Sequence, residues 1–202
     1  MDLRIVRNNA IEYYLSVFRN KTTSSGECRH CVDMISLFLA GEISNYLQTE
    51  TKEIRTPLGN KDCKIISEEI VLIPVLRAGI AMLSSFQDVL PMSDVGFIWA
   101  HRDEKAQAIY DKHKFPADVE NKTFIIIDTM LATAGTINLA ADISKKCKPN
   151  KILCASVLST RYGIDHLSHI IDGFVTTGIE DALDEKQYVS PGVGDSGDRL
   201  YG

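Results

Sequence analysis

A carboxylate followed by small and hydroxyl-bearing residues lies where an apolar stretch ends in the middle of the chain. The stretch 124–127 ends at Asp128, and Thr129 to Thr136 precede a helical pattern. A strand, a loop of small residues and a helix N-terminus can form an anion site, because unpaired amides of the first helical turn point at the ligand. An ordinary strand-to-helix turn with Thr136 as N-cap explains these residues about as well. The loop lacks the Gly-x-x-x-x-Gly-Lys pattern of a Walker A motif.

Two arginines follow other apolar stretches and have the side chains best suited to phosphate oxygens. Arg77 lies in the segment PVLRAG, and Arg102 lies in HRDE. A planar guanidinium can bind two oxygens at once. Taken alone, an arginine at a strand end is more often a surface ion-pair residue.

The tail YVSPGVGDSGDR, residues 188–199, has glycines in the spacing Gly-x-Gly-x-x-Gly. A dinucleotide-binding fingerprint also needs a following helix within a βαβ unit. We expect no such unit in the few residues that follow, so the spacing does not indicate dinucleotide binding.

Strands and helices must position these segments, and the sequence indicates both. Apolar stretches rich in Ile and Val, which are typical of buried parallel strands, alternate with helical patterns. Strands are expected at 70–76, 95–99, 124–127 and 152–157, and helices at 79–89, 136–146 and 163–169. This alternation predicts an α/β fold, a mostly parallel twisted sheet flanked by helices, in a single domain over 1–202. Ligands of such sheets bind beyond the carboxyl ends of the strands.

An N-terminal helical segment is expected to precede the sheet. Ser24 and Glu27 have the spacing of a capping box, and apolar residues then recur at helical spacing, which predicts a helix over about 25–48. A shorter helix is expected over 9–18. The pair Cys28 and Cys31 lies at the start of the longer helix; zinc needs about four ligands and no second such pair is present, so we expect thiols that partly face the core and no protein metal site.

The composition excludes several functional classes. Hydrophobic residues make up 45% of the chain, enough for a substantial core, and the net charge of -5 argues against binding to nucleic acid or anionic lipid. The apolar stretch 70–76 is too short to span a bilayer, and no signal peptide is visible. Five cysteines without a secretion signal predict reduced thiols in the cytoplasm.

The order of residues from Asp128 to Thr136 resembles the loop that binds phosphoribosyl pyrophosphate (PRPP) in phosphoribosyltransferases. Most members have two adjacent acids here, whereas one acid followed by Met-Leu-Ala-Thr resembles the uracil phosphoribosyltransferases. The segments PVLRAG and HRDE and the glycine-rich tail are similar to segments of that family, in the same order. The resemblance covers about residues 54–202.

The resemblance implies transfer of the phosphoribosyl group of PRPP to uracil, giving UMP and pyrophosphate, with Mg²⁺ carried in by PRPP. It implies an oxocarbenium-like state at the anomeric carbon, catalysis by Asp195 and Arg102, a flexible arm near 103–115, and a homodimer or homotetramer. The residues implied to bind PRPP are Arg77, Arg102, Asp128, Thr129, Met130, Leu131, Ala132, Thr133, Ala134, Gly135, Thr136 and Asp195. Those implied to bind uracil are Val189, Gly194, Asp195 and Ser196.

Three positions depart from the family pattern. Thr129 stands where the family usually has Pro, Ala134 replaces the first Gly of a pair, and the arm has only Tyr110 in place of paired tyrosines. If position 134 needs a positive φ, Ala costs roughly 1–2 kcal/mol. These departures leave open a non-catalytic, nucleotide-sensing protein on the same fold. An RNA-binding pyrimidine regulator is a further alternative, which the net charge disfavours.

Overall fold

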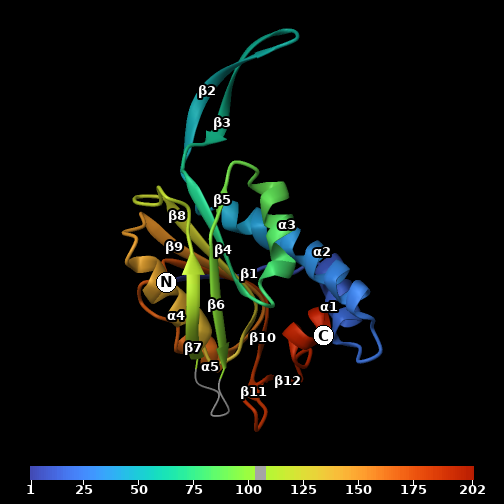
Figure 1. The fold of residues 1–202 in the computed structure, drawn as a ribbon. Helices are drawn as coiled ribbons and strands as arrows, with labels where there is room; N and C mark the ends of the chain where they lie inside the picture. The colour runs from blue at the N-terminus through green and yellow to red at the C-terminus, as the bar shows by residue number, and fades with distance from the viewer. Residues whose placement is uncertain (103–107) are drawn as a thin grey trace.

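A central sheet organises the chain, and the computed structural model describes residues 1–102 and 108–202, except for the side chains of His101 and Arg102. The sheet has eight strands, and its path runs, in spatial order, β1 (Asp2–Ile5), β10 (Gly173–Glu180), β9 (Lys151–Thr160), β8 (Thr123–Leu131), β4 (Ile70–Leu76), β6 (Phe97–Arg102) and β7 (Ala108–Lys114), with β5 (Asp94–Val95) paired to β4 (Figure 1). Only β6 and β7 pair antiparallel among these strands. The predicted α/β fold with a mostly parallel sheet is confirmed.

Helices cover both faces of the sheet. On one face lie α1 (Asn9–Arg19), α2 (Ser25–Ser44), α3 (Ile80–Val89) and the short α6 (Ser196–Tyr201), and on the other lie α4 (Gly135–Lys145) and α5 (Arg161–Asp165) (Figure 1). Successive residues of β8 enter different cores: Ile125 and Ile127 pack on the α2 side, and Ile126 packs on the α4 side. Coverage of both faces explains why these strands are apolar throughout rather than alternating.

The apolar stretch predicted as one strand at 95–99 is two strands. β5 ends at Val95 and β6 begins at Phe97; both pair in parallel with β4, and Gly96 between them donates its N–H to the carbonyl of Leu72 at 2.9 Å. A side chain at Gly96 would lie 2.6 Å from the Phe115 ring, so glycine allows this close approach. The other three predicted strands are present, and β8 and β9 extend further than expected.

The capping box of α2 is confirmed: Ser24 accepts from the Glu27 amide, and the Glu27 carboxylate accepts from the Ser24 amide. The helix ends at Ser44, four residues before the predicted end, and turns lead into the next strand. Cys28 and Cys31 are buried in the core, as expected, and burial raises the pKa of both thiols.

The last predicted helix, 163–169, is α5 at Arg161–Asp165. It begins earlier because the Thr160 hydroxyl accepts the Gly163 amide at 2.8 Å and caps the helix. It ends earlier because the Asn138 amide donates to the His166 carbonyl and its oxygen accepts from Ser168 N, both at 2.8 Å. These bonds turn the chain where the pattern alone indicated helix.

Two hairpins differ from expectation. The unpredicted strands β2 (Thr49–Thr56) and β3 (Gly59–Ile66) form a hairpin that projects from the body, with Leu58 fully exposed near its tip (Figure 1). Residues 108–114 of the arm expected near 103–115 form strand β7, which was not among the expected strands, by backbone pairing with β6. Residues 103–107 of that arm lie outside the described residues. Within the described part of the chain, no helix is long and apolar enough to cross a membrane.

A mostly buried ion pair ties the base of the projecting hairpin to the sheet. Lys151 Nζ donates to Glu68 Oε1 at 2.8 Å and to the Tyr46 carbonyl at 2.9 Å, and the Glu68 carboxylate also accepts from the Gln48 amide and the Thr123 hydroxyl. The Glu68 side chain is only 7% exposed. Burial raises its pKa, but the hydrogen bonds from Lys151 and Thr123 lower it, and the pKa of Glu68 lies below its ordinary 4.5.

Lys151→Met is expected to lower the free energy of unfolding by about 3–5 kcal/mol, because it leaves a buried carboxylate without its cation. Urea denaturation at pH 7 measures the loss. Since folding lowers the pKa of Glu68, the stabilisation is present above pH 4.5 and is lost as the pH falls through the folded pKa. The difference between the proteins should therefore shrink in acid. Lys148→Met is the control, because its pair with Glu120 is exposed; equal losses in both variants would contradict the prediction.

Candidate active site

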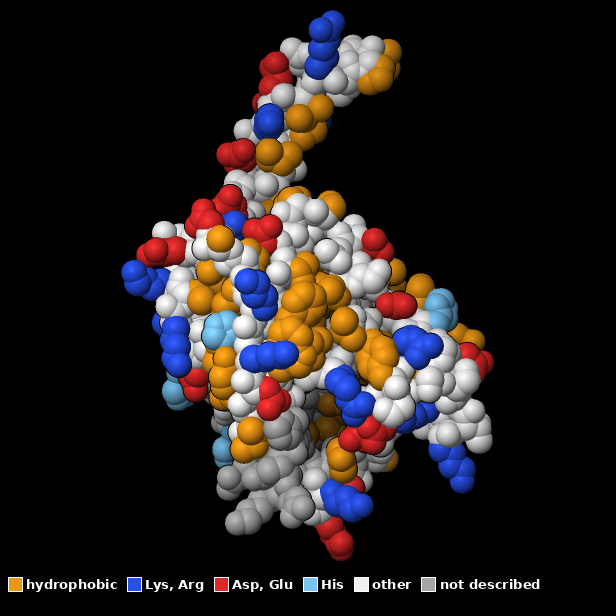
Figure 2. Space-filling model, viewed as in Figure 1, with side chains coloured by type: hydrophobic (Ala, Val, Ile, Leu, Met, Phe, Trp, Pro, Cys, Tyr) orange, Lys and Arg blue, Asp and Glu red, His pale blue; other side chains and the backbone are white. Residues whose placement is uncertain are grey.

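A cavity of about 330 Å³ opens at the carboxyl ends of the central parallel strands. In Figure 2 the surface is hollowed at the lower centre, between the end of the sheet and the C-terminal segment. Three segments distant in sequence supply most of the lining: the end of β4 and its loop, the end of β8 with the start of α4, and the tail. The lining residues are Val75, Leu76, Arg77, Ala78, Ala100, Asp128, Met130, Ala132, Thr136, Tyr188, Val189, Gly194, Asp195, Ser196 and Gly197.

The loop after β4 brings Arg77 to the mouth of this cavity. Gly79 makes the close approach possible, because a Cβ there would lie 2.3 Å from the carbonyl oxygen of Ile127 on the neighbouring β8. Arg77 Nη2 donates to Asp198 Oδ1 at 2.8 Å, and its Nη1 donates to the Gly202 carbonyl at 2.9 Å. These two bonds join the tail to the pocket. The Arg77 side chain is still 59% exposed, so it remains open to a ligand.

The segment 128–136 divides between the cavity and the core. Asp128, Met130, Ala132 and Thr136 line the cavity. Leu131 and Ala134 pack in the core, Thr129 is fully buried, and Thr133 and Gly135 are partly exposed outside the lining. The alternative of Thr136 as N-cap is wrong, because α4 begins at Gly135 with Ala134 as its cap residue. The first-turn amides of α4 therefore start two residues earlier than with Thr136 as cap, beside the cavity.

Ala134 has the positive φ that a glycine usually supplies, with φ 67° and ψ -9°. Position 134 therefore does need a positive φ, the condition raised in the sequence analysis. Ala134 carries the conformational strain of the left-handed region. The chain keeps this backbone geometry without the glycine, and the buried Ala134 methyl group packs in the core on the α4 side.

Ala134→Gly is expected to change the free energy of unfolding by less than about 1 kcal/mol. Relief of roughly 1–2 kcal/mol of strain is offset by loss of a buried methyl, about 0.8 kcal/mol, and by a more flexible unfolded chain, about 0.4–1 kcal/mol. Ala134→Val should destabilise the protein by about 2 kcal/mol or more, because a β-branched residue fits neither this φ nor the packed site. Denaturant titration measures both; a Val variant as stable as the parent would contradict this account.

The tail places one carboxylate in the cavity with both oxygens hydrogen-bonded. The chain passes through β11 (Ala182–Leu183) just before the tail, and the tail then forms β12 (Val189–Ser190) and enters α6. Asp195 caps α6: its Oδ1 accepts from the Asp198 amide at 3.0 Å, and its Oδ2 accepts from the Tyr188 hydroxyl at 2.9 Å. Tyr188 lines the cavity and was not among the predicted site residues, although it begins the quoted tail. The tail is helical from Ser196, because Asp195 supplies an N-cap.

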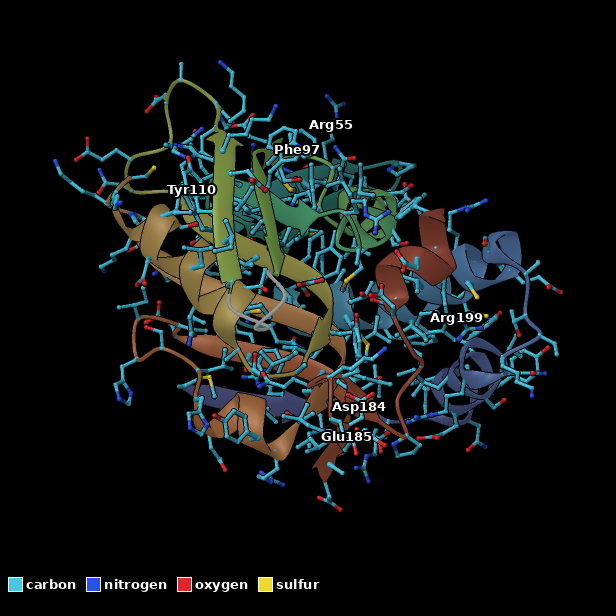
Figure 3. The ribbon with its side chains drawn as sticks, turned by 60° about the horizontal axis from the view of Figure 1, so that its bottom comes forward. Arg55, Phe97, Tyr110, Asp184, Glu185 and Arg199 are labelled. Atoms are coloured by element: carbon cyan, nitrogen blue, oxygen red, sulfur yellow. The ribbon has the colours of Figure 1, made fainter. Side chains whose placement is uncertain are left out.

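Arg199 anchors the tail to the N-terminal helices. Its Nη1 donates to the carbonyls of Val193, at 3.0 Å, and Phe18, and its Nη2 donates to that of Asn20 at 2.7 Å. In Figure 3, Arg199 lies between the tail and α1. The Arg199 side chain thus donates to main-chain carbonyls, a role that no sequence pattern indicated.

Tyr110 and Arg102, the two residues singled out in and beside the expected arm, have different outcomes. Tyr110, on β7, hydrogen-bonds through its hydroxyl to His113 Nδ1 at 2.7 Å. Figure 3 shows it well away from Asp184 and Glu185, which mark the tip of the β11–β12 hairpin, and it does not line the cavity. Arg102 ends β6 at the same edge of the sheet as the cavity, but its side chain lies outside the description, so its role stays a prediction.

Comparisons with known proteins extend over nearly the whole chain. A family model described as uracil phosphoribosyltransferase matches residues 5–202. The uracil phosphoribosyltransferase of Natranaerobius thermophilus is 33% identical over 204 residues, covering 99% of this chain and 98% of its own. That of Lactococcus lactis subsp. cremoris is 34% identical over 205 residues, covering 98% and 97%.

Solved structures extend the comparison to the fold. A protein structure from Aquifex aeolicus has a TM-score of 0.91 and 29% identity, covering 98% of this chain and 97% of that one. A purine phosphoribosyltransferase from Pyrococcus horikoshii has a TM-score of 0.51 and 17% identity, covering 77% and 90%. The second likeness is one of fold alone.

Proposed function

The chain belongs to the uracil phosphoribosyltransferase family, and on this premise we propose that it transfers the phosphoribosyl group of PRPP to uracil, giving UMP and pyrophosphate. The observation that carries the proposal is the single cavity into which Arg77, Asp128 and Asp195 converge from three segments. That cavity combines a cation for phosphate oxygens, a helix N-terminus and two carboxylates.

PRPP has two anionic ends, and the cavity offers a separate group to each. The 5′-phosphate is assigned to the loop 132–136, where amides of the first turn of α4 and the Thr136 hydroxyl can donate to its oxygens. The pyrophosphate is assigned to Arg77, whose forked guanidinium can hold two oxygens, and to Arg102 at the end of β6. Asp128, between these groups, is assigned to the ribose.

Uracil is assigned to the tail side of the cavity, against Val189, Gly194 and Ser196. The edge of the base alternates carbonyl and N–H groups, and main-chain amides and carbonyls complement that pattern. Asp195 lies on the same wall, so its carboxylate is placed to face both the base and the ribose.

The reaction forms a bond between N1 of uracil and the anomeric carbon as the bond to pyrophosphate breaks. Positive charge develops on the ribose, as in glycosyl transfer generally, and a carboxylate nearby stabilises it. We assign this role to Asp195, which can also accept the N1 proton, and Tyr188 holds one of its oxygens in place. The protein supplies no covalent nucleophile in this scheme; it positions the reactants and neutralises the leaving group.

Mg²⁺ is expected to enter with PRPP. This ion is usually held by one or two carboxylates together with substrate phosphates and water. Asp128 and Asp195 both line the cavity and have suitable oxygens, so the donor set fits the ion. Its contribution when bound is to neutralise charge on the pyrophosphate.

We also propose a cytoplasmic homodimer or homotetramer. All five cysteines are free thiols, which suits a reducing compartment. The projecting β2–β3 hairpin is exposed along both strands, and an isolated two-stranded hairpin is only marginally stable in water, which supports its being covered by a second copy. Light scattering coupled to size-exclusion chromatography measures the assembly.

The test of the proposed function is UMP formation by the purified chain from uracil, PRPP and Mg²⁺. Cytosine and purine bases in parallel reactions define the substrate class. Turnover with uracil in preference to the other bases is the expected result. Binding of PRPP without any turnover would overturn the enzymatic proposal and favour a nucleotide sensor on this fold.

A further inference from the structure

A pair of hydroxyl groups joins the end of strand β8 to the tail just behind the cavity. Thr129 Oγ1 and Ser196 Oγ lie 2.7 Å apart, a normal hydrogen-bond distance. Thr129 is fully buried and does not line the cavity, whereas Ser196 is 7% exposed and does. The bond therefore runs from the interior of the protein to the wall of the cavity.

The surroundings hold both side chains in place. Ile125 and Ile127 precede Thr129 in β8 and belong to the core cluster on the α2 side. Val193 and Leu200, on either side of Ser196 in the tail, belong to the same cluster. The two hydroxyls thus meet within an apolar contact that fixes the tail against the sheet, and their separation is set by packing on both sides.

The direction of this hydrogen bond follows from counting donors. Each hydroxyl has one proton, and in the described part of the chain neither has a second hydrogen-bond partner. If Ser196 were the donor, the proton of the fully buried Thr129 would have no acceptor, at a cost of about 1–3 kcal/mol. If Thr129 is the donor, its proton is satisfied and the Ser196 proton is left to point into the cavity. The second arrangement is favoured.

We propose that Thr129 is a positioning residue that makes Ser196 a hydrogen-bond donor to a carbonyl oxygen of the pyrimidine base. This inference rests on the proposed function and adds to it the direction of one recognition contact. Because Thr129 donates to Ser196, the serine hydroxyl is free to donate into the cavity. A proline at position 129, usual in the family, carries no hydroxyl, so this relay is specific to chains with a hydroxyl at both positions.

The test compares Thr129→Val, Thr129→Ser, Ser196→Ala and the double variant Thr129→Val with Ser196→Ala. Valine has nearly the shape of threonine and carries a methyl group in place of the hydroxyl. Thr129→Val and Ser196→Ala are each expected to raise KM for uracil about threefold to tenfold, the range for one hydrogen bond. The KM for PRPP and kcat should stay within about twofold, because the lost contact lies on the base.

Two readouts separate positioning from mere packing. The double variant should be no worse than Ser196→Ala alone, because the two hydroxyls act as one unit. Thr129→Ser should recover most of the uracil affinity lost in Thr129→Val. The inference is overturned if KM for uracil is unchanged in Thr129→Val, if the two effects multiply, or if KM for PRPP rises equally. Should Thr129→Val fail to fold, an unchanged KM for uracil in Ser196→Ala would still overturn it, and a raised KM would support it.

Calorimetric titration with uracil distinguishes failure of this inference from failure of the proposed function. If the parent protein makes UMP and Thr129→Val binds uracil equally well, only the inference fails. If the parent binds uracil without turnover and Thr129→Val weakens that binding, only the catalytic proposal fails. If the parent neither binds uracil nor makes UMP, both fail.

Discussion

Asp195→Asn is expected to lower kcat for UMP formation by about two to four orders of magnitude, the range for loss of a positioned acid–base group. The carboxylate is the group assigned to the developing positive charge and to the N1 proton, and an amide can serve neither. The fold should survive, because Asn caps a helix as well as Asp and can still accept from the Asp198 amide. Steady-state kinetics and a thermal melt of the same sample give the two numbers.

The matched control is Glu185→Gln, which removes one negative charge from the exposed tip of the β11–β12 hairpin (Figure 3). It should leave kcat within about twofold, because exposed charges at a distance are largely screened by salt. A loss of kcat shared by both variants would mean that net charge, and not the position of Asp195, is responsible. Unchanged kinetics in Asp195→Asn would remove the carboxylate from the mechanism.

Arg77→Ala is expected to lower kcat/KM for PRPP by about two to three orders of magnitude, the range for removing one donor that stabilises developing anionic charge. The guanidinium lies at the cavity mouth and is assigned to the leaving pyrophosphate. Arg77→Lys keeps the positive charge and can still pair with Asp198, but it lacks the planar fork. The kcat/KM for PRPP of Arg77→Lys should therefore fall between the values of the parent and of Arg77→Ala. Initial rates at varied PRPP and saturating uracil measure both.

Arg55→Ala is the control for loss of one arginine, because Arg55 is exposed on the projecting hairpin, away from the cavity (Figure 3). It should leave kcat/KM for PRPP unchanged within about twofold. The assignment of Arg77 would be wrong if Arg77→Ala raised KM for uracil but not for PRPP. That result would mean that Arg77 acts only by holding the tail through Asp198 and Gly202.

The sequence predicted the parts of the site that follow directly from strand endings. Arg77 directly follows β4, and Asp128 directly follows the apolar run of β8; parallel pairing brings these two positions to the same edge of the sheet. At position 134 the sequence raised a condition, a possible positive φ, and the structure meets it. These features depend on local pattern and on the geometry of parallel sheets.

Other features depend on contacts between distant segments, which no local pattern carries. The bond between Arg77 and Asp198 exists only because the tail folds back on the sheet. The β2–β3 hairpin was missed for a different reason: its strands are exposed on both faces, so their sequences show no alternation of polar and apolar residues. Strand β10 was not among the predicted strands, and Gly178 within it weakens the strand pattern there.

The pairing of β1 with β10 has a consequence for the order in which the protein is made. Asp2 to Ile5 pair in parallel with Gly173 to Thr176, so β1 leaves the ribosome well before its partner strand does. At ordinary elongation rates this interval is roughly 10–30 s. Throughout it the nascent β1 is an unpaired edge, the kind of segment that can join strands of other chains. Natural proteins oppose such pairing with short edge strands and charged side chains, and β1 is short and carries the charges of Asp2 and Arg4.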